Sequence, residues 1–206
     1  WRRRVLDNYV IMPITINGSG TIGGISVGGL PDGIVDTDMI AAGAVNSAKS
    51  TGLTSPFVSY AYYEEQESSG TDAGTMTDGT WHVRALNVEV ADPDSIGSLS
   101  SNQVTLQAGT YFARWAAPAR EVDRHQTRLY NATDSSQIAM GETYQTHFQG
   151  DASTGTSSGA TRFTISGAKA IELQHKCNHT TANYGQGLHN SFGTNVYARL
   201  EIFKEA

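Results

Sequence analysis

The alternation of apolar and polar residues is clearest between Gln103 and Asn131, where the chain reads QVTLQAGTYFARWAAPAREVDRHQTRLYN. Apolar residues recur there at every second position, which is the pattern of a half-buried β-strand. Gly and Pro residues interrupt the alternation and mark turns. The pattern predicts three consecutive strands with a turn after Pro118, at Gln103–Gln107, Thr110–Ala117 and Arg124–Asn131.

The middle strand of the three is apolar on both faces. Tyr111 and Trp115 point one way, and Phe112 and Ala116 point the other, with Arg114 beside them. A strand with one face in water should alternate apolar and polar residues. We therefore expect the second face to be covered by another sheet or by another subunit.

The same pattern continues through the chain after Pro56 and predicts an all-β sandwich. Two long polar loops are expected, at Gln149–Ala160 and Thr180–Gly193. The further strands are predicted at Val58–Gln66, Trp81–Val90, Gln137–Tyr144, Thr161–Ser166, Ala170–Asn178 and Asn195–Lys204.

Composition divides the chain into residues 1–30, 31–54 and 55–206. The first region is rich in glycine, and the second opens with a turn at Pro31-Asp32-Gly33. Asp36 or Thr37 can then cap a short helix, which is too short to be stable alone. Its apolar residues are Met39, Ile40, Ala44 and Val45.

Charge and composition exclude several classes of function. The net charge of −6 argues against nucleic-acid binding, which needs clustered Lys and Arg. No apolar stretch approaches the ~20 residues of a membrane-spanning helix, so we expect no membrane insertion. Charged residues make up only 17% of the chain, which favours a built-in oligomer. The lone Cys177 excludes an intrachain disulfide.

Two short motifs resemble sites of known chemistry but lack the context that such sites need. Residues 18–23 match G-x-G-x-x-G, and residues 24–28 match G-x-S-x-G. Both motifs require a helix directly after them, and Gly28, Gly29 and Pro31 prevent one. We therefore expect no enzymatic activity and no cofactor.

One strand carries three possible metal ligands on a single face, namely His175, Cys177 and His179. The first and last lie ~13 Å apart on a strand and cannot share one ion. Ile171 and Leu173 continue the same face, so we expect it to be buried in the core. The alternative is a site on a threefold axis that takes one such residue from each subunit.

Three stretches of the chain resemble virion proteins of tailed bacteriophages. The segment from Met12, with LPDG at residues 30–33 and IAAGAV at 40–45, is similar to the N-terminal part of tail-fibre-like proteins. AGTY at residues 108–111 and RLYN at 128–131 resemble a tumour-necrosis-factor-type jelly roll. AIELQHKC at 170–177 and VYARLEIFKE at 196–205 resemble the last strands of the same phage modules.

The resemblance implies a homotrimeric jelly-roll head on a short stem, located in the virion. Residues 1–30 would anchor it to other virion proteins, and the helices of residues 31–54 would pack together near the threefold axis. Glu201 would lie in the trimer interface together with Tyr111, Phe112, Arg114, Tyr130, Tyr197, Arg199 and Phe203.

The leading functional prediction is attachment to the host cell surface by the β head, through a bacterial surface glycan or another envelope receptor. Tyr184, His189 and Asn190 in the second long loop offer aromatic and amide groups suited to a sugar. The main alternative is a capsid decoration or head-fibre protein with a purely structural role. A glycan-cleaving enzyme is a distant third, because it needs two carboxylates ~5–10 Å apart.

Overall fold

The computed structural model describes residues 15–16, 22–23, 55–148 and 153–205. The chain divides into two units, residues 1–54 and 55–206. In the first unit, β1 (Thr15–Ile16) pairs with β2 (Ile22–Gly23) in an antiparallel ladder. The predicted stem helix with Met39, Ile40, Ala44 and Val45 lies outside the described residues.

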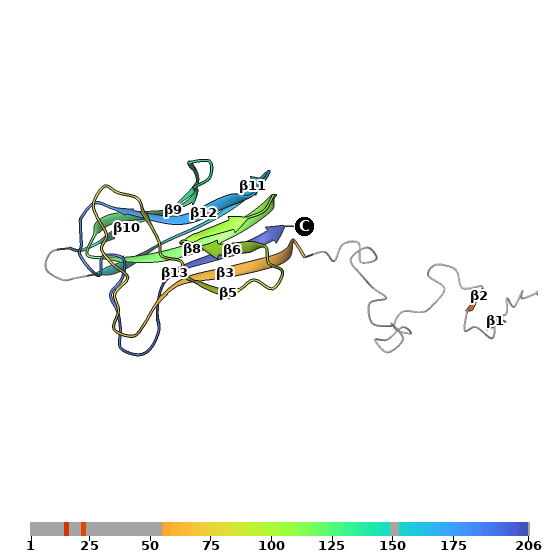
Figure 1. Ribbon diagram of the computed structural model, residues 1–206, viewed down its shortest axis with the longest axis horizontal. Helices are drawn as coiled ribbons and strands as arrows, with labels where there is room; N and C mark the ends of the chain where they lie inside the picture. The colour runs from red at the N-terminus through yellow and green to blue at the C-terminus, as the bar shows by residue number, and fades with distance from the viewer. Residues whose placement is uncertain (1–14, 17–21, 24–54, 149–152, 206) are drawn as a thin grey trace, which may run out of the picture. The chain divides into compact units, whose positions relative to one another are not determined.

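The second unit, here called the head, is a sandwich of two antiparallel sheets (Figure 1). The six-stranded sheet has the order β10-β9-β12-β7-β6, with β4 also paired to β12, and the five-stranded sheet has the order β11-β8-β13-β3-β5. The strands are β3 (Phe57–Glu67), β4 (His82–Val83), β5 (Val88–Ala91), β6 (Gly97–Ser100), β7 (Gln103–Leu106), β8 (Gly109–Arg120), β9 (Asp123–Asn131), β10 (Ser136–Thr146), β11 (Thr154–Ile165), β12 (Lys169–Cys177) and β13 (Asn195–Glu205).

The path of the chain is that of a jelly roll, because most connections pass from one sheet to the other. Only the hairpins β6–β7 and β9–β10 join neighbours within a sheet. Within the described residues there are strands and turns but no helix, in agreement with the predicted all-β class. No helix of the described part is long and apolar enough to cross a membrane.

The core lies between the two sheets and follows from the alternation along each strand. In β8 the alternate residues from Tyr111 to Ala119 are all buried, and in β9 the alternate residues from His125 to Asn131 are buried. Polar contacts also join the sheets in this core, where Trp115 Nε1 donates a hydrogen bond to Thr127 Oγ1 at 2.9 Å and the Thr127 backbone N–H donates to Ser157 Oγ at 2.9 Å. Burying the indole is favourable because its N–H keeps a partner.

The turn predicted after Pro118 is wrong, since β8 continues to Arg120. A proline inside a strand is tolerated where its missing N–H would face no partner strand. The pairing of β13 with β8 ends at Ala116, and Pro118 pairs only with Thr156 of β11 on its other side. The Pro118 carbonyl accepts a hydrogen bond from the Arg84 guanidinium instead of from a ladder.

The loop predicted at Gln149–Ala160 is also wrong for most of its length, because β11 begins at Thr154. The glycines of this segment make room for aromatic rings instead of forming a turn. A Cβ added to Gly159 would lie 2.2 Å from Trp115 Cζ2, and one added to Gly155 would lie 2.1 Å from Tyr144 Cδ1. Only glycine lets these rings lie against the strand.

The predicted strand Trp81–Val90 is two strands in two different sheets. β4 pairs with β12 in the six-stranded sheet, and β5 pairs with β3 in the five-stranded sheet. The chain changes sheets at Arg84, which is fully buried. The second predicted loop, Thr180–Gly193, contains only a single bridge, from Met76 to Thr181.

A buried ion pair holds this change of sheets in place. Arg84 Nε lies 2.7 Å from Glu65 Oε2, and the two side chains are 0% and 1% exposed. The other guanidinium nitrogens donate to the carbonyls of Pro118 and Gln186, at 3.3 Å and 3.0 Å. Burial raises the pKa of Glu65, although the Arg84 charge acts in the opposite direction. The pair thus joins β3, β8 and the loop after β12 at one point.

Replacing Arg84 by Met should lower the free energy of unfolding by about 3–5 kcal/mol, because the Glu65 carboxylate would remain buried without a partner. Urea denaturation measures the difference. The double variant Arg84→Met with Glu65→Leu should recover much of the loss. The control Arg162→Met removes an ion pair with Glu205 in which Arg162 is 63% exposed, and should lower the free energy of unfolding far less. Equal losses for Arg84→Met and Arg162→Met would contradict a special role for the buried pair.

Candidate functional site

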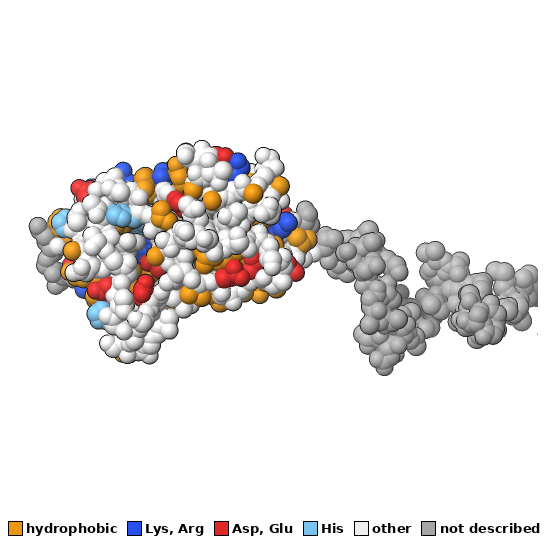
Figure 2. Space-filling model, viewed as in Figure 1, with side chains coloured by type: hydrophobic (Ala, Val, Ile, Leu, Met, Phe, Trp, Pro, Cys, Tyr) orange, Lys and Arg blue, Asp and Glu red, His pale blue; other side chains and the backbone are white. Residues whose placement is uncertain are grey.

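The long connections of the head gather at one end of the sandwich, here called the loop end (Figure 1). They are the β3–β4, β10–β11 and β12–β13 connections, and the short β8–β9 turn lies among them. The first residue of β3 and the last residue of β13 pair at the opposite end. Histidine side chains lie at the surface of the loop end (Figure 2). Polar and aromatic side chains of several connections therefore share this end.

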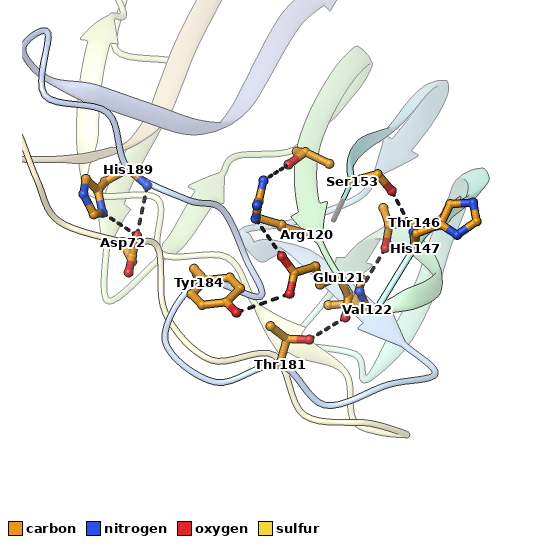
Figure 3. Close-up of polar contacts among 11 residues, drawn as sticks. Asp72, Arg120, Glu121, Val122, Thr146, His147, Ser153, Thr181, Tyr184 and His189 are labelled. Atoms are coloured by element: carbon orange, nitrogen blue, oxygen red, sulfur yellow. Dashed lines mark hydrogen bonds and ion pairs between the residues drawn. The ribbon is translucent and has the colours of Figure 1, made fainter. Parts of the chain in front are cut away.

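Tyr184 in the loop end is used to hold two connections together. Its hydroxyl donates to Glu121 Oε2 at 3.2 Å, while Thr181 Oγ1 donates to the Glu121 carbonyl (Figure 3). Arg120 Nε lies 3.1 Å from the other Glu121 carboxylate oxygen. Glu121 has a φ of 55°, a backbone conformation that non-glycine residues rarely adopt, so these contacts stabilise a strained turn.

His189 and Asn190 are likewise engaged within the loops. The backbone N–H and Nδ1 of His189 both lie within hydrogen-bonding distance of Asp72 Oδ1, at 2.9 Å and 2.7 Å. The hydrogen bond from the His189 backbone is the main cause that lowers the pKa of Asp72. Asn190 Oδ1 accepts from the Phe192 backbone at 2.8 Å. Figure 3 shows Tyr184 and His189 directed at different partners, so the loop fold does not bring them into one site.

The outer face of the five-stranded sheet is a second candidate surface. Phe57, Phe112 and Phe203 form a cluster there, with ring centroids 5.2–6.4 Å apart. Tyr60 is 46% exposed, and with Tyr62 and Phe203 it lines a shallow hollow of about 300 Å³. We call the five residues Phe57, Tyr60, Tyr62, Phe112 and Phe203 the aromatic face. Hydrophobic side chains are visible along the β3 and β5 side of the head (Figure 2).

Ion pairs cross the same face, two of them between neighbouring strands and one, Arg162–Glu205, over β8. Their distances are 2.5 Å for Arg114–Glu201, 2.7 Å for Arg162–Glu205 and 3.2 Å for Arg199–Glu64. Tyr62 donates a short hydrogen bond to Glu64, and burial together with this bond raises the pKa of Tyr62 to about 12. Burial alone would raise the pKa of Glu64, but hydrogen bonds from Tyr62 and Gln66 and the Arg199 charge lower it overall.

The structure brings together Phe112, Arg114, Arg199, Glu201 and Phe203 from the predicted trimer interface. All five lie on the outer face of β8 and β13, and Phe203 is directly opposite Phe112 in the register. This grouping makes a common interface possible, and the trimer itself stays a prediction.

Three other residues of the predicted interface lie elsewhere. Tyr111 is fully buried and Tyr197 is 7% exposed, so both are core residues of their own chain with little surface left for a partner. Their hydroxyls donate to the carbonyls of Gln107 and Thr71. Tyr130 lies on the outer face of the other sheet, where its ring is 4.3 Å from the Arg128 guanidinium.

Sequence reasoning missed Phe57, Tyr60 and Tyr62 as part of this surface. The signal was present, because FVSYAYY at residues 57–63 is apolar at both parities, as the strand with Phe112 is. Two strands of one sheet with this property indicate one shared apolar face, which neither strand indicates alone.

The predicted burial of His175 and Cys177 is confirmed, at 0% and 1% exposure. His175 Nε2 lies 2.9 Å from Nδ1 of the buried His125. The alternative threefold-axis site is therefore closed to His175 and Cys177, which have no surface. His179 is half-buried, with its ring stacked on Phe148 at 4.3 Å. Among the described residues no group of three His, Cys, Asp or Glu side chains could hold a metal ion.

The sequence matches none of the protein families and none of the curated proteins with which it was compared. Solved structures do match the head. The Eiger TNF of S. frugiperda has a TM-score of 0.50 at 12% identity, covering 74% of this chain and 94% of that one. The globular domain of zebrafish complement 1qA (TM-score 0.46, 11% identity, 71% and 96% covered) and murine APRIL (0.46, 10%, 71% and 98%) also match.

The likeness to the Eiger TNF shows the fold. The head is a two-sheet jelly roll. This confirms the predicted fold class, and at 12% identity it carries no further statement about function. The place of this chain in a bacteriophage particle stays a prediction.

The buried histidine pair should make the head less stable in acid. Burial, with the nearby Arg84 charge, lowers the pKa of His125 from 6.5 to about 4 and that of His175 well below 6.5. Between these values the unfolded chain binds protons that the folded chain does not, so stability is complete above about pH 6.5 and falls below it. Each histidine contributes up to about 1.4 kcal/mol per pH unit.

Urea denaturation between pH 7 and pH 5 measures this slope. His125→Gln should reduce the slope, because one of the two neutral histidines is then absent. His147→Gln is the control, since His147 is exposed in the β10–β11 connection and should leave the slope unchanged. A slope that is the same in wild type and His125→Gln would contradict the assignment.

Proposed function

We propose that this protein is a homotrimeric, non-enzymatic, fibre-like component of a bacteriophage virion whose β head binds the host cell surface. The observation that carries the proposal is the aromatic face, an apolar surface that the single chain leaves uncovered. The sequence resemblance to tail-fibre-like proteins, outside and inside the head, supplies the virion context.

The aromatic face supports self-association because its residues come from three adjacent strands and form one continuous surface. Contiguous exposed apolar surface of this kind marks interaction sites on soluble proteins. Closed symmetric assembly of identical chains buries such a face without any other partner. Arg114, Glu201 and Arg199 are already paired at its edge, so a partner would not have to bury an isolated charge.

The arrangement of the head supports display of the loop end. β3 begins at Phe57 and β13 ends at Glu205, and both residues lie at the end of the head opposite to the long connections. In the proposed particle, residues 1–30 anchor the protein to other virion proteins. The helices of residues 31–54 pack around the threefold axis through Met39, Ile40, Ala44 and Val45. The loop end is the end of the head opposite to the point where the chain enters it.

A capsid decoration or head-fibre protein is the second candidate, and one observation favours it. Tyr184, His189 and Asn190, the predicted receptor contacts, are each used in contacts within the loops. A scaffold that uses these groups to stabilise its own loops needs no receptor. The two candidates share the trimer and differ in the place of the protein on the particle.

Phe112→Asp should convert the trimer to monomer at micromolar concentration, because the new carboxylate would be buried without a partner at the subunit contact. Light scattering or analytical ultracentrifugation measures the mass. Met140→Asp is the matched control, since Met140 is 37% exposed on β10 of the other sheet. A monomeric wild type, or a Phe112→Asp variant that remains trimeric, would contradict the proposed assembly.

Electron microscopy of the labelled particle tests the virion role, and competition of the purified protein with phage adsorption tests host binding. We expect a position on the tail and a loss of adsorption with the added trimer. The Phe112→Asp variant should compete less well, because it lacks the multivalency of the trimer. A position on the capsid lattice would contradict the tail-fibre role and support the capsid decoration role. A tail position with unchanged adsorption would remove the receptor role and keep the fibre.

A further inference from the structure

A cleft lies on the outer face of the six-stranded sheet, on the side of the sandwich away from the aromatic face. It has a volume of about 250 Å³ and is called here the Trp81 cleft. Trp81, just before β4, lies on one side of it, and the ends of β9, β10 and β12 supply the rest. Its lining residues are Trp81, Arg124, His125, Gln126, Thr143, Lys176 and Asn178.

The Trp81 cleft concentrates the unpaired positive charge of the head. Ten Lys and Arg residues follow position 54, and six of them form ion pairs, which leaves four. Within the described residues these four, Arg124, Arg128, Lys176 and Lys204, have no carboxylate partner. Arg124 and Lys176 line the cleft, and Arg128 stacks on its tryptophan. In a chain of net charge −6, this grouping is a local exception.

The tryptophan is held rigidly as a wall of the cleft. The Arg128 guanidinium lies 4.0 Å from the centre of the Trp81 ring and 4.3 Å from that of Tyr130. Arg128 Nε in turn donates to Gln174 Oε1 at 2.8 Å. Because Arg128 is fixed between two rings and an amide, Trp81 is fixed with it. Lys176 Nζ lies 5.9 Å from the same ring, which places a cation beside this aromatic wall.

Polar groups of the cleft complete the set that a sugar requires. Gln126 Nε2 donates to the Gly141 carbonyl at 2.7 Å, which fixes the amide and leaves its oxygen as an acceptor. Thr143 and Asn178 are exposed and add a hydroxyl and a second amide. The only acidic side chain on the neighbouring positions of β12, Glu172, is occupied by hydrogen bonds from Gln103 and Gln174.

We propose that the Trp81 cleft binds an acidic saccharide, with its carboxylate or phosphate group on Arg124 and Lys176 and a sugar ring against Trp81. A volume of about 250 Å³ fits one or two sugar units and lies just below the roughly 300–1,000 Å³ of typical ligand pockets. The overall negative charge opposes a long phosphate backbone, which needs an extended basic surface.

This inference rests on the proposed host attachment for the source of the saccharide, and it moves the contact from the loop end to the side of the head. If the trimer forms through the aromatic face, the cleft stays open on each subunit. The three clefts of one trimer would together raise the avidity for a repeating surface polymer, without new contacts.

Titration of the full chain with trigalacturonate, with maltotriose as the neutral control, tests the proposal by calorimetry and by the indole N–H resonance of Trp81. We expect trigalacturonate to bind, to shift that resonance and to weaken with added salt, and maltotriose to bind much more weakly. Lys176→Gln and Arg124→Gln should each weaken binding roughly tenfold. Lys204→Gln is the matched control, because it removes the fourth unpaired cation, which lies outside the cleft, and should leave the affinity unchanged.

Inorganic phosphate and galacturonate, each as competitor, distinguish the two acidic groups, and displacement by either one supports the site. Failure of both trigalacturonate and inorganic phosphate to bind, each titrated directly and followed by the Trp81 resonance, overturns the proposal, as does equal binding of maltotriose or equal weakening by Lys204→Gln. If the cleft binds the saccharide but the purified protein does not affect adsorption, this inference holds and the proposed host attachment is wrong. If the purified protein blocks adsorption and the double variant Lys176→Gln with Arg124→Gln blocks it equally well, the protein attaches to the host, but not through the cleft.

Discussion

The buried ion pair of Arg84 and Glu65 is the constraint on which the arrangement of the head depends. The pair lies where the chain leaves the six-stranded sheet for the five-stranded one, and its remaining donors fix β8 and the loop after β12. A buried pair of this kind is weak support for stability in itself, since two apolar residues could fill the same space. Its value is specificity, because this arrangement of β3, β8 and that loop gives each nitrogen of the guanidinium a partner.

The two outer faces of the sandwich differ in the side chains that they expose. The five-stranded sheet presents aromatic rings at its outer face, with charges that are paired to each other. The six-stranded sheet presents cations without carboxylate partners in the described part of the chain, stacked on and beside a tryptophan. The first is suited to a second copy of the chain and the second to a small anionic ligand. The loop end, where the sequence placed binding, uses its polar side chains mainly to stabilise strained turns.

The class of the fold could be predicted because alternation in β8, β9 and β12 is a local property. Each strand separates a core-facing from an outward-facing set whatever its partners are, so Trp115, Leu129 and Leu173 were bound to lie inside. The predicted loop and turn were wrong because glycine and proline each occur in strands as well as in turns. Gly155 and Gly159 indicated a loop, but they make room for Tyr144 and Trp115, and Pro118 indicated a turn in a strand that has lost its partner on one side. Neither use is visible without the neighbouring strand.

The sequence by itself determined that the head is an all-β sandwich, that one strand carries apolar residues on both faces, and that His175 and Cys177 are buried. Those properties follow from the order of residues along single strands. Only the tertiary structure decided that Tyr111 and Tyr197 are core residues while Phe57, Tyr60 and Phe112 share a surface. Only the tertiary structure also placed Trp81, Arg124 and Lys176 around one cleft, since strands far apart in sequence become neighbours through long-range pairing, which no local pattern encodes.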